Sequence, residues 1–185
     1  ARTVVGWVMA VPGSVCRVPD MQENRRVTLE HLRRCRNLRF ISVWNPSFLT
    51  LLLRGSNPRD LWPDLELISC WTSAVSARFV PELHSLFPGV EIQGKGLLAT
   101  EGVVSFPEVG RPAPSPAITS HFLEFVDERG QARLADELEV GSRYSVLLTT
   151  GGGFARYALQ DTVEVVAPNA IEFVRIPNGP HSFAS

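Results

Sequence analysis

The stretch of residues 65–93 constrains the fold most, because it predicts a strand, a helix and a second strand in immediate succession. Residues 65–71 are a short apolar run typical of a buried strand, and residues 74–86 carry apolar side chains at helical spacing. A Pro-Gly pair ends that helix, and the β-branched run 90–93 follows at once. Two strands joined by one helix build a parallel sheet with a right-handed crossover. The sequence therefore predicts an α/β part with a parallel sheet and flanking helices.

The glycine-rich stretch 94–102 follows the second of these strands. Ligands of parallel sheets gather at the carboxyl ends of the strands. Thr100 and Glu101 place a hydroxyl beside a carboxylate, which suits a phosphate oxygen and a hard cation. Gly96 and Gly102 flank the pair and allow a ligand to come close to the backbone. Judged alone, the stretch also fits an ordinary solvated loop.

A second polar stretch, residues 149–157, ends in Arg156 and Tyr157, with Asp161 just beyond it. Two such loops in one small domain suggest one nucleotide held between them. Of the carboxylates of Glu101 and Asp161, one would hold a divalent cation and the other would accept bonds from two ribose hydroxyls. Arg156 offers a planar fork for a phosphate or carboxylate. The alternatives are a turn residue for Asp161 and a surface ion pair for Arg156.

The chain changes character after the proline-rich link 111–116, which cannot continue a helix or a ladder. Alternating apolar runs then predict antiparallel strands at 118–126, 144–149 and 162–166. The predicted fold class is therefore α/β, a mixed parallel sheet with flanking helices followed by a β-rich antiparallel part. The expected division is an α/β part over residues 1–110, a β-rich part over 117–176 and a tail over 177–185.

The first third of the chain predicts two helices. Thr28 can cap a helix that runs to about Cys35, with its arginines on the solvent-exposed face. A basic patch is the alternative for those arginines. Asn45 begins a second helix through Leu53, and this helix is apolar nearly all round, so we expect it to be buried.

Composition excludes several classes of protein. The 185 residues are 44% hydrophobic, as in a soluble globular domain, and their formal net charge of −1 gives no field that recruits nucleic acid. No apolar run reaches the about 18 residues that span a bilayer, so we expect no membrane partner. Three cysteines without metal-like spacing predict free thiols in the cytoplasm.

Several segments together resemble a bacterial member of the auxin-responsive Gretchen Hagen family, the acyl-acid-amido synthetases of the acyl-adenylating superfamily. The similarity runs in order over nearly the whole chain, through residues 41–49, 61–63, 68–71, 93–102 and 149–161. It implies that ATP and a small carboxylic acid give an acyl-adenylate, and that an amino-acid amine then attacks the activated carbonyl. ATP and Mg²⁺ are the implied cofactors.

The resemblance assigns roles to residues of both polar stretches. Thr100 and Glu101 match the adenylate motif and would act catalytically, Thr100 at the α-phosphate and Glu101 as the magnesium ligand. Asp161 matches the aspartate that takes the ribose hydroxyls. The implied nucleotide contacts are Gly96, Ala99, Thr100, Glu101, Gly102, Arg156, Tyr157 and Asp161.

The chain also departs from the family pattern. Ala158 and Gln160 stand where the family usually has an arginine and a glycine, which predicts a looser nucleotide site. Leu97 occupies the position of an adenine-stacking tyrosine. Neither the Ser/Thr/Gly-rich phosphate loop nor the small lysine-bearing domain of the family is found. We therefore expect part of a large adenylating domain, inactive alone, whose partner is the remainder of the enzyme. A non-catalytic remnant or binding domain and an acyl-CoA ligase remain the alternatives.

Overall fold

The computed structural model describes residues 9–111 and 113–175, which form two compact units. The first unit comprises the described residues up to Cys70 together with residues 78–93, and the second comprises residues 71–77 and those from 94 onward. Each unit has an apolar core of its own. The predicted tail, 177–185, lies outside the described residues, and the predicted division near residue 110 stays a prediction.

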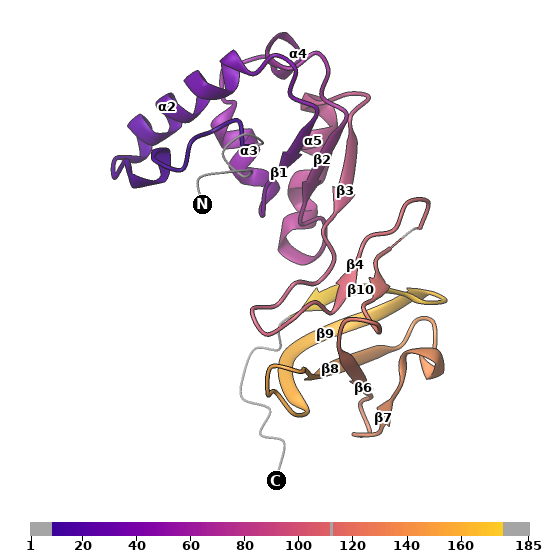
Figure 1. Ribbon diagram of the computed structural model, residues 1–185. Coiled ribbons are helices and arrows are strands. Elements are labelled where there is room, and N and C mark those ends of the chain that lie inside the picture. The colour runs from indigo at the N-terminus through magenta and orange to yellow at the C-terminus, as the bar shows by residue number, and fades with distance from the viewer. Residues whose placement is uncertain (1–8, 112, 176–185) are drawn as a thin grey trace. The chain divides into compact units, whose positions relative to one another are not determined.

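The first unit is built on a three-stranded sheet in the order β1-β2-β3 (Figure 1). β1 (Phe40–Ser42) pairs in parallel with the central strand β2 (Leu67–Cys70), and β3 (Glu91–Gly94) is the other neighbour of β2. Ile68 and Cys70 of β2 are completely buried, as a central strand requires. The predicted α/β part with parallel pairing is confirmed.

The helices of this unit differ from the predictions in detail. The predicted helix at 74–86 is divided into the 3₁₀ helix η2 (Ala74–Phe79) and α5 (Val80–Leu86), because Pro81 favours a helix start at its position. α3 (Pro46–Leu52) begins as expected after Asn45, whose side chain accepts a hydrogen bond from the Ser47 amide. The expectation that α3 is buried all round is wrong, since Phe48 and Leu51 are exposed.

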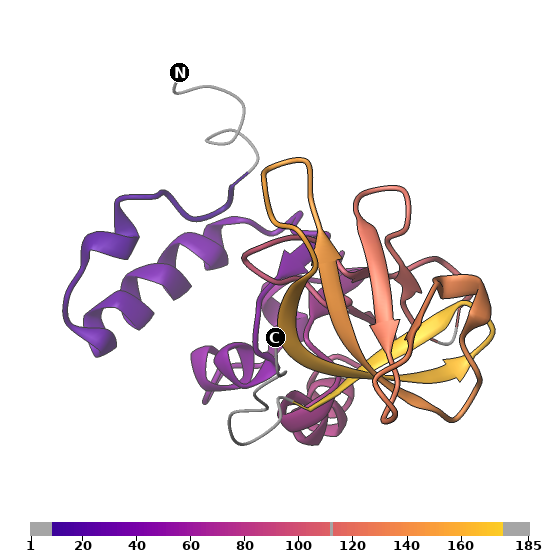
Figure 2. The same ribbon diagram turned by 90° about the horizontal axis from the view of Figure 1, so that it is seen from below.

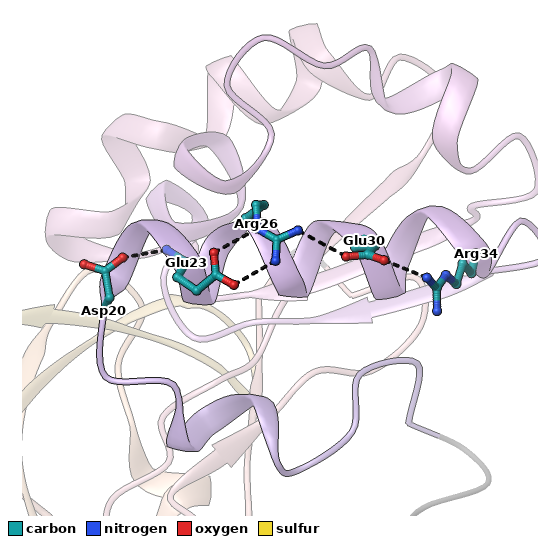
Figure 3. A network of polar contacts seen from close by, with 5 residues as sticks. All are labelled: Asp20, Glu23, Arg26, Glu30 and Arg34. Atoms are coloured by element: carbon teal, nitrogen blue, oxygen red, sulfur yellow. Dashed lines mark hydrogen bonds and ion pairs between the residues drawn. The ribbon is translucent and has the colours of Figure 1, made fainter.

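The long helix α2 (Met21–Arg34) starts a full two turns before the predicted cap at Thr28. Its cap is Asp20, whose carboxylate accepts a hydrogen bond of 2.8 Å from the Glu23 amide. Ion pairs run along its exposed face from Glu23 to Arg34, as Figure 3 shows. Arg26 and Arg34 therefore pair with carboxylates of the same helix, whereas Arg25 donates to the backbone carbonyls of Leu52 and Arg54. These contacts explain the clustering without a basic patch. The remaining short helices of the unit are η1 (Val15–Arg17) and α4 (Pro58–Leu61).

The second unit contains a five-stranded antiparallel sheet in the order β10-β9-β8-β6-β7. Its strands lie side by side in Figure 2, and β9 is long and strongly curved in Figure 1. The strands are β6 (Phe122–Val126), β7 (Ala132–Arg133), β8 (Arg143–Thr149), β9 (Tyr157–Ala167) and β10 (Ala170–Arg175), with η3 (Ala135–Glu137) between β7 and β8. The predicted β-rich antiparallel part is confirmed.

The proline-rich link is partly a strand after all. β5 (Ser115–Pro116) pairs antiparallel with β4 (Ser105–Phe106), so the prediction that the link forms no ladder is wrong at its last two residues. A two-residue strand tolerates proline because few ladder hydrogen bonds are lost. Among the described residues, the helices are too short or too polar to cross a bilayer.

Candidate nucleotide site

Residues 97–105 form a tight hairpin that carries Thr100 and Glu101 at its tip. The Ala99 amide donates to the Gly102 carbonyl over 3.0 Å, and the Val104 amide donates to the Leu97 carbonyl over 3.0 Å. Thr100 is exposed and Glu101 is half-buried. The hairpin therefore presents the hydroxyl and the carboxylate at one turn.

The two glycines beside this tip are required by the chain's own packing. Gly96 has a φ of +76°, and a Cβ there would collide with the backbone carbonyl of Ser105. A Cβ on Gly102 would lie 2.8 Å from Nε2 of His121. Packing within the chain therefore already explains why both positions are glycine. Their contacts with a nucleotide stay predictions.

Leu97 lies at the base of the hairpin and packs against the apolar core of the antiparallel sheet. It also lines a narrow cavity of about 20 Å³ enclosed by residues of segments 71–73, 95–97 and 171–173. The aliphatic side chain at this position therefore serves the packing of the unit.

Asp161 lies in a bulge of β9. Ser145 of β8 is paired with Thr162, whereas Leu147 is paired with Ala158, so residues 159–161 face Val146 alone. Gln160, in the middle of the bulge, has a φ of +61°. Bulges bend a strand and redirect its side chains, and this one sets the direction of the Asp161 carboxylate.

Glu101, Tyr157 and Asp161 come together in the second unit. Hydrogen bonding to the Glu101 carboxylate, together with the negative charge of that group, raises the pKa of Tyr157, so the two side chains are neighbours. Burial raises the pKa of Asp161, and the charge of Glu101 raises it further. The two carboxylates therefore lie within electrostatic reach of each other. That they hold one nucleotide between them stays a prediction.

Arg156 precedes Tyr157 and pairs with a residue of β6. Its Nε donates to Oε2 of Glu124 over 3.0 Å, and its amide donates to Oγ1 of Thr149 over 2.9 Å. The surface ion pair left open by the sequence is therefore present. Glu124 was not among the predicted site residues. Its only signal in the sequence is its position as a carboxylate between two apolar residues of an alternating strand.

A divalent cation at this site would have few protein ligands. Within residues 9–111 and 113–175, acidic, histidine and cysteine side chains nowhere gather in groups of three. Mg²⁺ usually binds one or two carboxylates and takes its other ligands from phosphates and water. The repulsion between Glu101 and Asp161 favours a cation beside them, so the donor set fits magnesium bound together with a nucleotide.

Comparisons with known proteins identify similar sequences and folds. Residues 115–175 match the model of the GH3 family central domain. A probable indole-3-acetic acid-amido synthetase GH3.6 of rice, Oryza sativa subsp. japonica, is 27% identical over 124 residues, which cover 58% of this chain and 25% of the rice protein. The solved GH3.15 acyl acid amido synthetase superposes with a TM-score of 0.71 at 13% identity, over 90% of this chain and 41% of that structure.

A 2-hydroxyisobutyryl-CoA ligase, solved with its acyl-AMP and CoA, superposes with a TM-score of 0.57 at 14% identity, over 91% of this chain and 35% of that structure. The chain thus spans about a quarter of the rice relative and about two fifths of the GH3.15 structure. At these identities the likeness of structures establishes the fold. The chain has a fold like that of a part of the GH3.15 acyl acid amido synthetase and of the 2-hydroxyisobutyryl-CoA ligase.

Proposed function

We propose that this chain is part of a GH3-type acid–amino acid ligase, which adenylates a small carboxylic acid with ATP and transfers the acyl group to an amino-acid amine. The observation that carries the proposal is the meeting of Glu101, Tyr157 and Asp161 in one place. These are the residues that the adenylating motifs assign to the nucleotide. The family match over residues 115–175 supports the same function.

The proposed roles follow from the local chemistry. Asp161 is partly buried and lies near another negative charge, so new hydrogen-bond donors would stabilise its ionised carboxylate. Two ribose hydroxyls would supply them. Thr100, exposed at the hairpin tip, would donate its hydroxyl to a phosphate oxygen.

Glu101 would hold the magnesium ion, and the neighbouring Tyr157 hydroxyl would help to orient that carboxylate. When bound, Mg²⁺ would offset the negative charge that develops on the phosphates as pyrophosphate leaves. The acceptor of the acyl group, the acid and a cytoplasmic location belong to the proposal as well. The remainder of the adenylating enzyme would complete the site, so we expect the chain alone to bind nucleotide weakly and to turn over no substrate.

Isotope exchange between ATP and pyrophosphate tests the proposal in the complete gene product that contains this sequence. We expect exchange that depends on a carboxylic acid and is abolished by Glu101→Ala. Adding amino acids or coenzyme A afterwards shows which acceptor consumes the adenylate, and consumption by coenzyme A would identify an acyl-CoA ligase. An absence of exchange with every acid of a broad panel would refute the ligase and favour a non-catalytic binding domain, in line with Ala158 and Gln160.

A further inference from the structure

We propose that Glu124 is a positioning residue that holds the Arg156 guanidinium for an anionic ligand, a phosphate group of the bound nucleotide. The inference rests on the proposed function for the identity of the ligand. The pairing of Glu124 with Arg156 is observed in the structure. Glu124 is distant in sequence from both polar loops and belongs to neither adenylating motif.

The burial of the two partners is unequal. The Glu124 side chain is 14% exposed, whereas the Arg156 side chain is 63% exposed. Glu124 lies in β6 between Leu123 and Phe125, which fill the core on the opposite face of the sheet. A carboxylate with so little exposure is favoured in the paired state, so it constrains the more exposed arginine.

The backbone at Arg156 is held as well. Arg156 has a φ of +47°, a left-handed conformation that persists only where neighbouring contacts maintain it. The hydrogen bond from its amide to Thr149 is one such contact, and the ion pair with Glu124 is the other. Tyr157 is the next residue, and it contacts Glu101. Fixing Arg156 therefore also fixes the start of β9 at the proposed site.

The pairing with Glu124 leaves most N–H donors of the Arg156 guanidinium available for a ligand. A contact through Nε uses one of the five N–H donors of an arginine, and the side chain remains largely exposed. The free edge of the fork suits two oxygens of a phosphate. Because the same turn leads into Tyr157, the natural ligand of this edge is a phosphate of the nucleotide that Glu101 and Asp161 are proposed to bind.

The second unit contains a matched control. Arg143 and Glu164 form an ion pair of the same kind, with 2.8 Å between Nε and Oε2. The pair joins β8 and β9 at the far end of β8, six residues from Thr149 and hence about 20 Å away. Glu164→Gln therefore breaks an equivalent pair on the same sheet without touching the proposed site.

The experiment compares Glu124→Gln, Glu164→Gln, Arg156→Ala and the double variant Glu124→Gln/Arg156→Ala. Two quantities are measured: solvent exchange of the arginine Nε protons by NMR, and affinity for AMP by calorimetry. We expect Glu124→Gln to speed exchange at Arg156 and to weaken AMP binding about tenfold. The double variant should bind AMP no more weakly than Arg156→Ala alone. Glu164→Gln should speed exchange at Arg143 and leave AMP affinity unchanged.

Two results would overturn the inference. One is unchanged exchange at Arg156 in Glu124→Gln. The other is a loss of AMP affinity from Glu124→Gln that is equally large in the Arg156→Ala background, because Glu124 would then not act through Arg156. If the unaltered chain bound no AMP while exchange at Arg156 still responded to Glu124→Gln, the proposed nucleotide site and the ligand assigned to Arg156 would be refuted, and the pairing alone would stand.

Discussion

Replacing Gln160 by glycine should stabilise the protein. Gln160 has a φ of +61° in the β9 bulge, and a left-handed backbone costs a residue with a Cβ about 1 to 2 kcal/mol. Glycine removes that strain but loses about 0.5 to 1 kcal/mol through the greater freedom of the unfolded chain. The Gln160 side chain is exposed, so little packing is lost. The expected net gain is about 1 kcal/mol, or about 4 °C in Tm.

Urea unfolding and thermal denaturation of the second unit measure this gain. Val166→Gly is the matched control, because it introduces glycine at another exposed position of β9 whose φ is not positive. That change should lower stability by about 1 kcal/mol. Gln160→Ala keeps the Cβ and should leave stability nearly unchanged. If Gln160→Gly were as destabilising as Val166→Gly, the backbone at residue 160 would carry no strain and the reasoning would fail.

Three further predictions concern the same unit. Burial and the charge of Glu101 raise the pKa of Asp161, so the folded state binds its proton more tightly than the unfolded state, and stability falls as the pH rises from the ordinary aspartate pKa through the raised one. Asp161→Asn should therefore stabilise the protein at neutral pH but not at a pH below the ordinary aspartate pKa. Urea unfolding at neutral pH and at that lower pH would reveal the difference. Glu101→Gln should lower the raised pKa of Tyr157 toward its ordinary value, as followed by tyrosinate absorbance, and an unmoved titration would contradict the hydrogen bond. Gly102→Ala would force a Cβ to 2.8 Å from a histidine ring nitrogen and should cost about 1 to 3 kcal/mol in urea unfolding, whereas Gly151→Ala, which has no heavy atom within 4 Å, should be nearly neutral.

The strands β2, β6 and β8 were predictable because their signals are local. β2 is a short apolar run, and β6 and β8 alternate between buried and half-exposed side chains, so their positions follow from residue type alone. Two polar loops and a family resemblance suggested that Glu101 and Asp161 share a site, and the structure brings the two carboxylates near each other.

Other features depend on distant pairing, which a sequence pattern does not record. The bulge at residues 159–161 exists because the pairing of β8 with β9 shifts on either side of Val146. The ion pair of Glu124 with Arg156 depends on β6 lying beside β8. The two wrong predictions of helix starts have local causes. Asp20, not Thr28, caps α2, and Pro81 marks the start of α5.

The bulge of β9 holds two neighbouring residues in unfavourable states. Asp161 is held where burial and a neighbouring carboxylate both oppose its charge, and Gln160 is held in a backbone conformation that favours glycine. Both cost stability. Unfavourable positions of this kind persist where a ligand compensates for them. Nucleotide binding should therefore raise the Tm of the unaltered protein more than that of Asp161→Asn, because only the unaltered carboxylate gains donors that it lacks. An equal rise in both proteins would mean that Asp161 is no part of the site.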